Sequence, residues 1–175
     1  MMNKLSPREM ADQAQRTYQA GDFALAAQAF AEAAAAYAEM GDALTAAEMQ
    51  NNCSVALLRA KQAQAALEAT QGTEKVFAEA GDFRRHGMAL ANQASALEAL
   101  KRFKDAIDCY ERAGDVLEKA NEANLRAEVM QLLSMLYLHR FKFYEAVIAL
   151  QSGLSGVKNP TPKQRFMKKI LFIRV

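Results

Sequence analysis

Few residues in this sequence have the types and spacing that catalysis or metal binding requires. The two histidines, His86 and His139, lie far apart, and neither lies three or four positions from a cysteine. Cys53 and Cys109 are also isolated, so they form neither a nucleophile paired with a base nor a set of metal ligands. Buried, unreactive thiols are the simpler interpretation. The sequence therefore predicts no catalytic residue and no metal site.

Motifs that bind phosphate or activate a nucleophile are not found either. The sequence has no Gly-rich phosphate loop, no H-E-x-x-H and no G-x-S-x-G. Carboxylate pairs such as Asp105 and Asp108 have basic neighbours, as on a solvated helix face. The basic pair Arg84–Arg85 is too small a patch for nucleic acid. We therefore expect a protein that is not an enzyme, needs no cofactor and does not bind nucleic acid.

Composition indicates a soluble helical protein in a reducing compartment. Hydrophobic residues make up 51% and charged residues 24% of the chain, and the three prolines lie near its ends. Two distant cysteines do not form a disulfide framework. The opening residues lack the apolar run of a signal peptide, and no stretch reaches the roughly 18–20 apolar residues of a membrane-spanning helix. These features predict a cytoplasmic location.

The elements that position these side chains are set by an internal repeat. AEMGD begins at Ala38, AEAGD at Ala78 and EKANE at Glu118, so related pentapeptides recur every 40 residues. On the same period small residues stand where small residues stood, as at Ala26, Ala66, Ala106 and Ala146. A period of this length is typical of a stacked repeat array.

Each repeat unit is expected to contain two helices, because its apolar residues recur at spacings of three and four. The first helix has its start signal at Ser6-Pro7, and Gly-Asp pairs mark its end and the boundaries between units. Asn121 replaces glycine at the third boundary. Gly72 and Gly114 fall inside expected second helices, at a cost of roughly 1 kcal/mol each.

The spacing Ala14, Phe23, Ala26, Phe30, Ala33 resembles the tetratricopeptide repeat (TPR), and the long period is similar to that of kinesin light chains and spindle-orientation adaptors. The resemblance covers about residues 6–157. It implies an all-α, right-handed superhelix, or α-solenoid, of four helical hairpins followed by a short C-terminal helix. The four repeats are expected at about 6–42, 43–82, 83–122 and 123–157.

The resemblance also implies where a partner would bind. In TPR proteins the first helix of each repeat lines a concave groove, and asparagines in long-repeat adaptors bind extended peptides. An amide side chain can donate and accept hydrogen bonds at once. An alternative is that Asn52 and Asn92 cap or bridge helices within the array. The partner-binding residues expected in this sequence are Gln15, Tyr18, Asn51, Asn52, Val55, Arg59, Met88, Asn92, Ser95, Gln131 and Met135.

The tail, residues 158–175, breaks the repeat and carries six basic residues without an acid. A helix from Pro162 to about Ile173 is expected, with apolar residues on one broad face. This helix could cap the array, lie on a membrane, or dock on another chain and so form a homo-oligomer. The residues expected to act in the last two cases are Phe166, Lys168, Lys169 and Ile170.

Two functional hypotheses follow. The preferred one is a non-enzymatic adaptor or scaffold that binds a partner peptide or helix in its concave groove. The alternative is a peripheral membrane or assembly scaffold that acts through the basic amphipathic tail helix.

Overall fold

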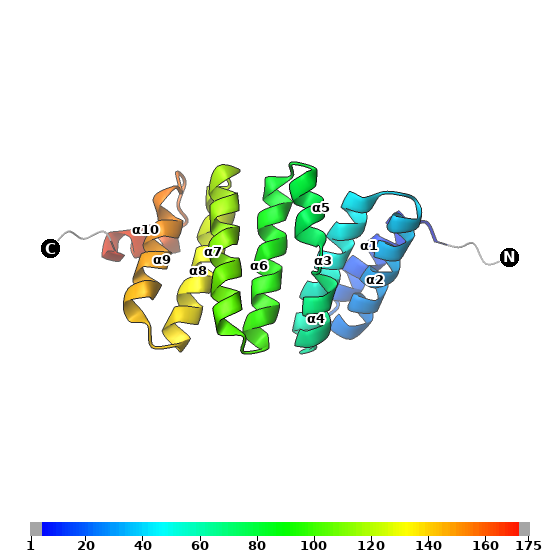
Figure 1. Ribbon diagram of the computed structural model, residues 1–175, viewed down its shortest axis with the longest axis horizontal. Helices are drawn as coiled ribbons and strands as arrows, with labels where there is room; N and C mark the ends of the chain where they lie inside the picture. Colours follow the sequence, from blue (N-terminus) through cyan, green and yellow to red (C-terminus); the bar gives the residue numbers. More distant parts are fainter. Residues whose placement is uncertain (1–4, 172–175) are drawn as a thin grey trace.

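The structure, a computed structural model, describes residues 5–171, and its only regular elements over that range are helices. The helices stack side by side into one elongated array, with α1 and α10 at opposite ends (Figure 1). Their bounds are α1 Pro7–Gln19, α2 Phe23–Glu39, α3 Ala43–Arg59, α4 Ala63–Ala69, α5 Thr73–Glu79, α6 Phe83–Ala99, α7 Phe103–Lys119, α8 Ala123–His139, α9 Phe143–Ser155 and α10 Pro162–Leu171. The expected all-α class is confirmed.

Residues at equivalent positions of the repeats have the same role in packing. The alanines one period apart, from Ala26 to Ala146, are all buried, which lets paired helices approach closely. Phe30 and Tyr110 are also fully enclosed at their shared position, where they pack as wedges in the core. The predicted register between repeats is therefore present in three dimensions.

Short turns with one residue at positive φ join the helices. Between repeats this residue is Gly41, Gly81 or Asn121, as the pentapeptides predict. Within the hairpins it is Gly21 in the first, but a residue with a side chain in the other three, namely Lys61, Lys101 and Phe141. Residues other than glycine and asparagine adopt this conformation at an energetic cost.

The second helix of repeat two differs from the prediction, because it is split into α4 and α5. Gly72 has φ 80° and lies at the N-cap of α5, so it is not inside a helix. The hydroxyl of Thr70 donates to the Leu67 carbonyl at 2.7 Å, and that of Thr73 to the Thr70 carbonyl at 2.9 Å. These side-chain bonds compete with the helical ladder, and glycine tolerates the resulting left-handed step.

Gly114 remains helical, and the packing explains it. A Cβ at Gly114 would lie 2.8 Å from the Met130 sulfur, and a Cβ at Gly153 would lie 2.6 Å from the Met130 Cβ. The two glycines therefore make room for one methionine of α8 between α7 and α9. Close packing offsets the weak helix propensity of glycine there.

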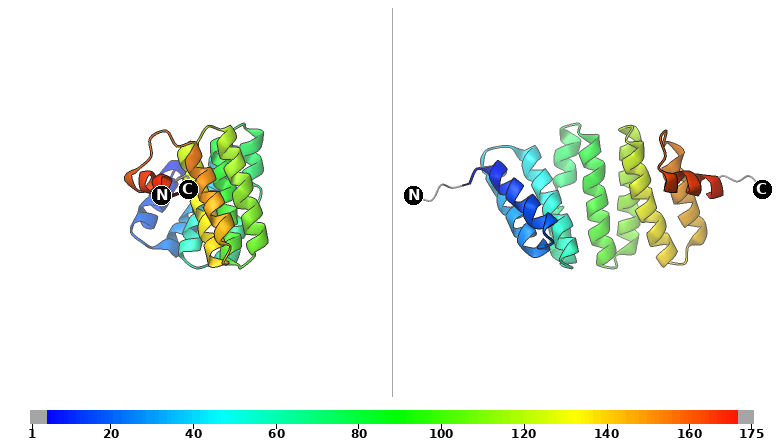
Figure 2. Two further views of the ribbon diagram at one scale, coloured as in Figure 1. Left: turned by 90° about the vertical axis from the view of Figure 1, so that its left-hand side faces the viewer. Right: turned by 180° about the vertical axis from the view of Figure 1, so that it is seen from behind.

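The tail forms α10, which lies crosswise against α9 at the end of the array (Figure 2). The predicted cap is present, since the Thr161 amide donates to Gln164 Oε1 at 2.8 Å. The helix buries none of its residues, and Lys168 Nζ reaches the Val157 carbonyl at 2.9 Å. The expected end at Ile173 falls outside the described residues. Within its described part, α10 covers α9 only in part.

Candidate peptide-binding groove

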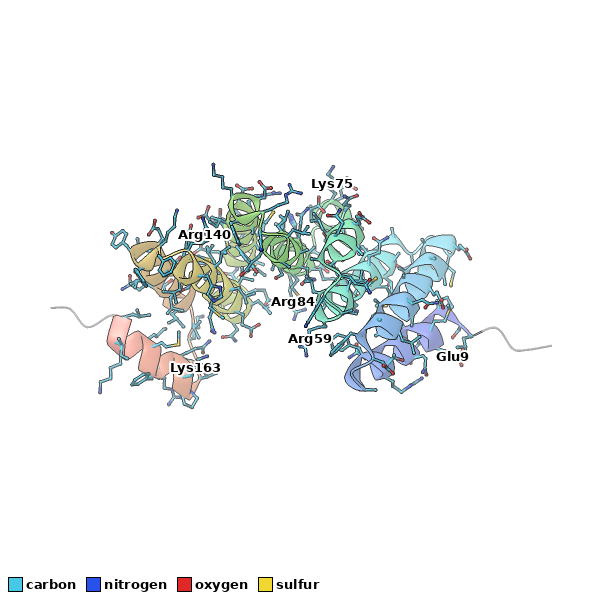
Figure 3. All side chains as sticks on the ribbon, turned by 90° about the horizontal axis from the view of Figure 1, so that it is seen from below. Glu9, Arg59, Lys75, Arg84, Arg140 and Lys163 are labelled. Atoms are coloured by element: carbon cyan, nitrogen blue, oxygen red, sulfur yellow. The ribbon has the colours of Figure 1, made fainter. Side chains whose placement is uncertain are left out.

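The array is curved, and its ends bend toward one side. Viewed from below, α1 and α10 flank the side on which Arg59 and Arg84 lie, whereas Lys75 and Arg140 lie on the opposite side (Figure 3). Arg59 belongs to α3 and Arg84 to α6, so first helices of successive repeats line this concave side, as the resemblance implies.

Two hollows of about 90 Å³ each adjoin at Asn52 on this side. The first lies between α3 and α6 and is lined by Glu48, Asn51, Asn52, Phe77, Arg84, Arg85, Met88 and Asn92. The second lies between α1 and α3 and is lined by Gln15, Tyr18, Phe30, Asn52 and Val55. We call the two hollows together the Asn52 groove. It gathers seven of the eleven residues that the sequence analysis names.

Asn51 bridges helices inside the array. Its residue surface is only 8% exposed, and its Nδ2 donates to the Ala47 carbonyl at 3.1 Å. Asn92 Nδ2 on α6 donates to Asn51 Oδ1 at 3.3 Å. This pair ties α3 to α6, which is the helix-bridging role that the alternative gave to Asn52 and Asn92. In the structure, Asn51 and Asn92 form that bridge.

Asn52 is in a different situation from its neighbour. It is half-buried, and within residues 5–171 its side chain makes no hydrogen bond. Its amide therefore offers two donors and an acceptor at the junction of the two hollows. An amide at the surface of a groove that is not engaged by the protein itself is able to pair with a ligand backbone.

Ion pairs neutralise the basic side chains at the rim of the groove. Arg85 contacts Glu48 at 3.1 Å and Asp82 at 3.3 Å, and Arg84 contacts Glu122 at 3.4 Å. Because both arginines are already paired with acids, the rim of the groove does not present them as a free basic clamp for a terminal carboxylate. An internal peptide segment, whose binding does not depend on a charged C-terminus, therefore fits this rim better than a segment held by its terminal carboxylate.

Aromatic stacking encloses the far wall near the first hairpin turn. The Arg59 guanidinium lies 4.7 Å from the centroid of the Phe23 ring, and Tyr18 meets the same ring edge-on at 5.3 Å. Arg59 does not line either hollow, so its cation–π contact makes it a supporting residue here. The resemblance to TPR proteins placed it in the groove, because it occupies a groove-facing position of the family's repeat.

A hydroxyl network supports the wall beside α6. Tyr110 OH lies 3.0 Å from Ser95 Oγ and donates to Glu98 Oε2 at 3.1 Å. Burial, more than any other cause, raises the pKa of Tyr110 far above its usual value, so the phenol stays protonated. The Ser95 hydroxyl is thus already hydrogen-bonded to Tyr110 and to the Ala91 carbonyl. The signal for this network in the sequence is a tyrosine where repeat one has Phe30.

Gln131 and Met135 lie on α8, outside both hollows. Gln131 is half-buried, and Met135 is 45% exposed. The first hollow is also lined by Glu48, Phe77, Arg84 and Arg85, which are not among the eleven expected partner-binding residues. Of these four, Glu48 does lie at a groove-facing position according to the resemblance. Phe77 follows the break at Gly72, so its position depends on a helix split that the repeat pattern did not predict.

The titratable groups that could do chemistry are buried or solitary. Burial raises the pKa of both cysteine thiols, which disfavours the nucleophilic thiolate. Burial also lowers the pKa of His86, whose Nδ1 is enclosed without a partner. In the described part of the chain, no three His, Cys, Asp or Glu side chains are close enough to share a metal ion.

The tail residues remain exposed. Phe166 is 65% exposed and Ile170 53%, Lys169 is exposed, and Lys168 is half-buried by its contact with α9. Among residues 5–171, no helix has the length and apolar character needed to cross a membrane.

Comparisons with known proteins agree with this architecture. A family model described as soluble NSF attachment protein, SNAP, matches residues 6–159. Among curated proteins none matches significantly. Two similar crystal structures, one of a glutamine-to-methionine variant, show nearly identical TPR-like repeats assigned to a kinesin light chain of Podosopora anserina. They are 17% and 18% identical, with TM-scores of 0.73 and 0.74, over 97% of this chain and 86% of theirs. The predicted TPR-like superhelix is confirmed.

Proposed function

This chain belongs to the soluble NSF attachment protein family, and we propose that it is a non-enzymatic adaptor whose Asn52 groove binds an extended segment of a partner protein. TPR-like folds are commonly protein-interaction scaffolds, which supports a protein partner. The observation that carries the groove assignment is the amide of Asn52, which lies between two hollows and has no hydrogen-bond partner in the described part of the chain.

The chemistry of the walls indicates what kind of segment fits. Tyr18, Val55 and Met88 give apolar surface on either side of Asn52. Two small hollows that meet at one amide suit two side chains of a strand-like peptide, with the backbone between them paired to Asn52. The neutralised rim adds no strong charge preference.

The test uses peptides selected on the intact chain from a random displayed library. Asn52→Ala should weaken the selected peptides about tenfold, because it removes roughly two hydrogen bonds of about 0.5–1.5 kcal/mol each. Gln50→Ala is the matched control, since Gln50 is an exposed amide on the same helix but lines a different surface. Equal affinities for the parent and the Asn52→Ala variant would remove the basis of the proposal.

A second candidate function is a scaffold on a membrane surface through α10. The exposure of Phe166 and Ile170 favours it, since a helix that only capped the array would bury them. If α10 is the anchor, Phe166→Ser with Ile170→Ser abolishes flotation of the chain with anionic vesicles without lowering its melting temperature. Retained flotation would exclude α10 as the anchor.

A further inference from the structure

The two long edges of the array carry turns of opposite charge. Each turn runs from a helix C-cap through a residue at positive φ to the next N-cap. The turns within hairpins lie along the lower edge in Figure 1, and the turns between repeats lie along the upper edge. The lower turns contain five basic residues and one acid, Lys61, Lys101, Arg102, Arg140, Lys142 and Asp22, whereas the upper turns contain three acids and no base, Asp42, Asp82 and Glu122.

The N-cap residues Arg102 and Lys142 on the lower edge do not make the capping hydrogen bonds that Asp42 and Asp82 make on the upper edge. On the upper edge Asp42 accepts from the Thr45 amide at 3.0 Å, and Asp82 accepts from the Arg85 amide at 2.9 Å. On the lower edge the N-caps Arg102 and Lys142 make no capping bond. A cation at a helix N-terminus also opposes the helix dipole. These two positive charges therefore make no capping bond to α7 or α9, and their local contacts are with Asp105 and Glu145 in the first turns of those helices.

Phe141 is the second feature that the fold does not explain. It is 82% exposed and has φ 59°, where Gly21 stands in the first hairpin. Lys61 and Lys101 have the same strained conformation at the equivalent position of the two preceding hairpins, so the exposed aromatic ring is what distinguishes Phe141. Its ring meets the edge of the Phe143 ring, with centroids 6.4 Å apart. An aromatic side chain is thus held in solvent at the tip of the lower edge.

Apolar surface continues from this tip along α9. Phe143 is 62%, Tyr144 76% and Ile148 46% exposed. In repeat three the positions of Tyr144 and Ile148 are occupied by Lys104 and Asp108. The last hairpin therefore combines an exposed aromatic and aliphatic patch with Arg140 and Lys142, a combination that the earlier hairpins do not have.

We propose that this lower edge, with Phe141 and Tyr144 at its tip, docks on a lipid bilayer that contains anionic lipids. Aromatic rings are stable at the interfacial level of a bilayer, and basic side chains are attracted to anionic headgroups. Turns aligned along one edge match a flat surface, whereas a peptide fits the groove on the concave side. The surface differs from α10, so the inference does not rest on the tail.

The acids near this edge leave it basic. Asp105 pairs with Arg102 at 2.7 Å, and Glu145 lies 3.8 Å from Lys142. Asp22 lies in the first hairpin turn, at the other end of the edge from Phe141. Lys61 and Lys101 have no ion pair within residues 5–171. Binding should therefore weaken as salt screens these charges.

The absence of tryptophan from the chain allows a direct test. Phe141→Trp, Phe166→Trp and Met40→Trp each place one fluorophore, on the lower edge, on α10 and on the upper edge. With phosphatidylcholine vesicles containing phosphatidylglycerol, the emission of Phe141→Trp should shift to the blue, and that of Met40→Trp should not. No shift in Phe141→Trp overturns the proposal, and a shift in Phe166→Trp alone assigns the contact to α10 and overturns it too.

A second variant removes the edge without harming the fold. Phe141→Gly with Lys142→Asp puts favoured residues at a positive φ and at an N-cap, so the melting temperature should hold or rise. Cosedimentation with the anionic vesicles should fall at least tenfold. Met40→Ser with Lys119→Glu makes the matched changes on the upper edge and should leave vesicle binding unchanged. Equal loss in both variants overturns the proposal, as does a parent chain that binds polyanions such as heparin but not the anionic vesicles.

Discussion

The helices are arranged alike in repeats two and three and in the last repeat, but the concave surfaces of these two regions differ in chemical character. Asn52 and Asn92 of α3 and α6 are equivalent to Leu132 of α8, one period apart in register. Both asparagines are half-buried, whereas Leu132 is 41% exposed and Met135 is 45% exposed. The inner junction is therefore polar and enclosed, and the terminal one is apolar and open.

This difference shows which positions the fold constrains. The buried alanines, from Ala26 to Ala146, persist in every repeat because helix spacing depends on them. The concave positions change freely from amide to leucine, since in a stacked array each repeat is stabilised mainly by its neighbours. Function in this chain must be sought at those changing positions.

The largest difference in stability between the first and the last repeat is expected at the position shared by Phe30 and Leu150. Phe30 is 2% exposed, so Phe30→Ala should cost about 3–5 kcal/mol through lost burial and a residual cavity. Its equivalent Leu150 is only half-buried, and Leu150→Ala should cost less than about 2 kcal/mol. Urea unfolding of both variants measures the difference. Similar losses would mean that the last repeat is packed as tightly as the first.

Gly87 and Gly114 both pack closely against a side chain, but the neighbour of Gly87 is rigid, whereas the neighbour of Gly114 can move. A Cβ at Gly87 would lie 2.5 Å from Leu117 Cγ, so Gly87→Ala should destabilise by about 1–3 kcal/mol. At Gly114 the clash is with the flexible end of Met130, and alanine also improves helix propensity. Gly114→Ala should therefore change stability by less than about 1 kcal/mol. Thermal melts that rank the two in the reverse order would contradict the packing described.

The adjacent asparagines should differ although they are chemically identical. Asn51→Ala leaves Asn92 Nδ2 without its partner, and the loss should be about 1–2 kcal/mol. Asn52→Ala removes no internal bond and should stay within about 0.5 kcal/mol of the parent. Chemical unfolding of both variants checks the assignment. A larger loss for Asn52→Ala would show that Asn52 is the bridging residue.

His86 gives the smallest effect, and it depends on pH. Burial, with help from Arg112, lowers the pKa of His86 below the usual value for histidine, about 6.5, against the opposing effect of Glu74. Folding then resists protonation, so stability is complete above that value and falls as the pH drops below it. His86→Ala should reduce the loss of melting temperature between about pH 7 and 5. An unchanged pH profile would show that His86 is protonated as easily in the folded state.

Most of the helices and turns could be predicted from the sequence, because the turn residues and the core residues recur every 40 residues. Asn121 could be identified as a glycine substitute from its register alone. The split at Gly72 could not, since glycine both interrupts helices and permits close packing, and only the threonine hydroxyl bonds decide between them. The positive φ of Phe141 was likewise unexpected, because residue type argues against it.

The roles of Asn51 and Asn52 also lay beyond the sequence. Neighbours on a helix point about 100° apart, and the angle at which α6 packs on α3 decides which of the two faces the groove. The resemblance to TPR proteins placed both in the binding region. It gave no means of knowing that Asn51 is occupied by Asn92.

The most direct measurement is of the side-chain amide resonances of the asparagines by NMR, during titration with a peptide selected on the intact chain. Our account predicts that the Nδ2 resonances of Asn52 shift with peptide, while those of Asn51, which donates to Ala47, move little. Saturable peptide binding that leaves the Asn52 resonances in place would contradict the account, because the partner would then occupy another surface.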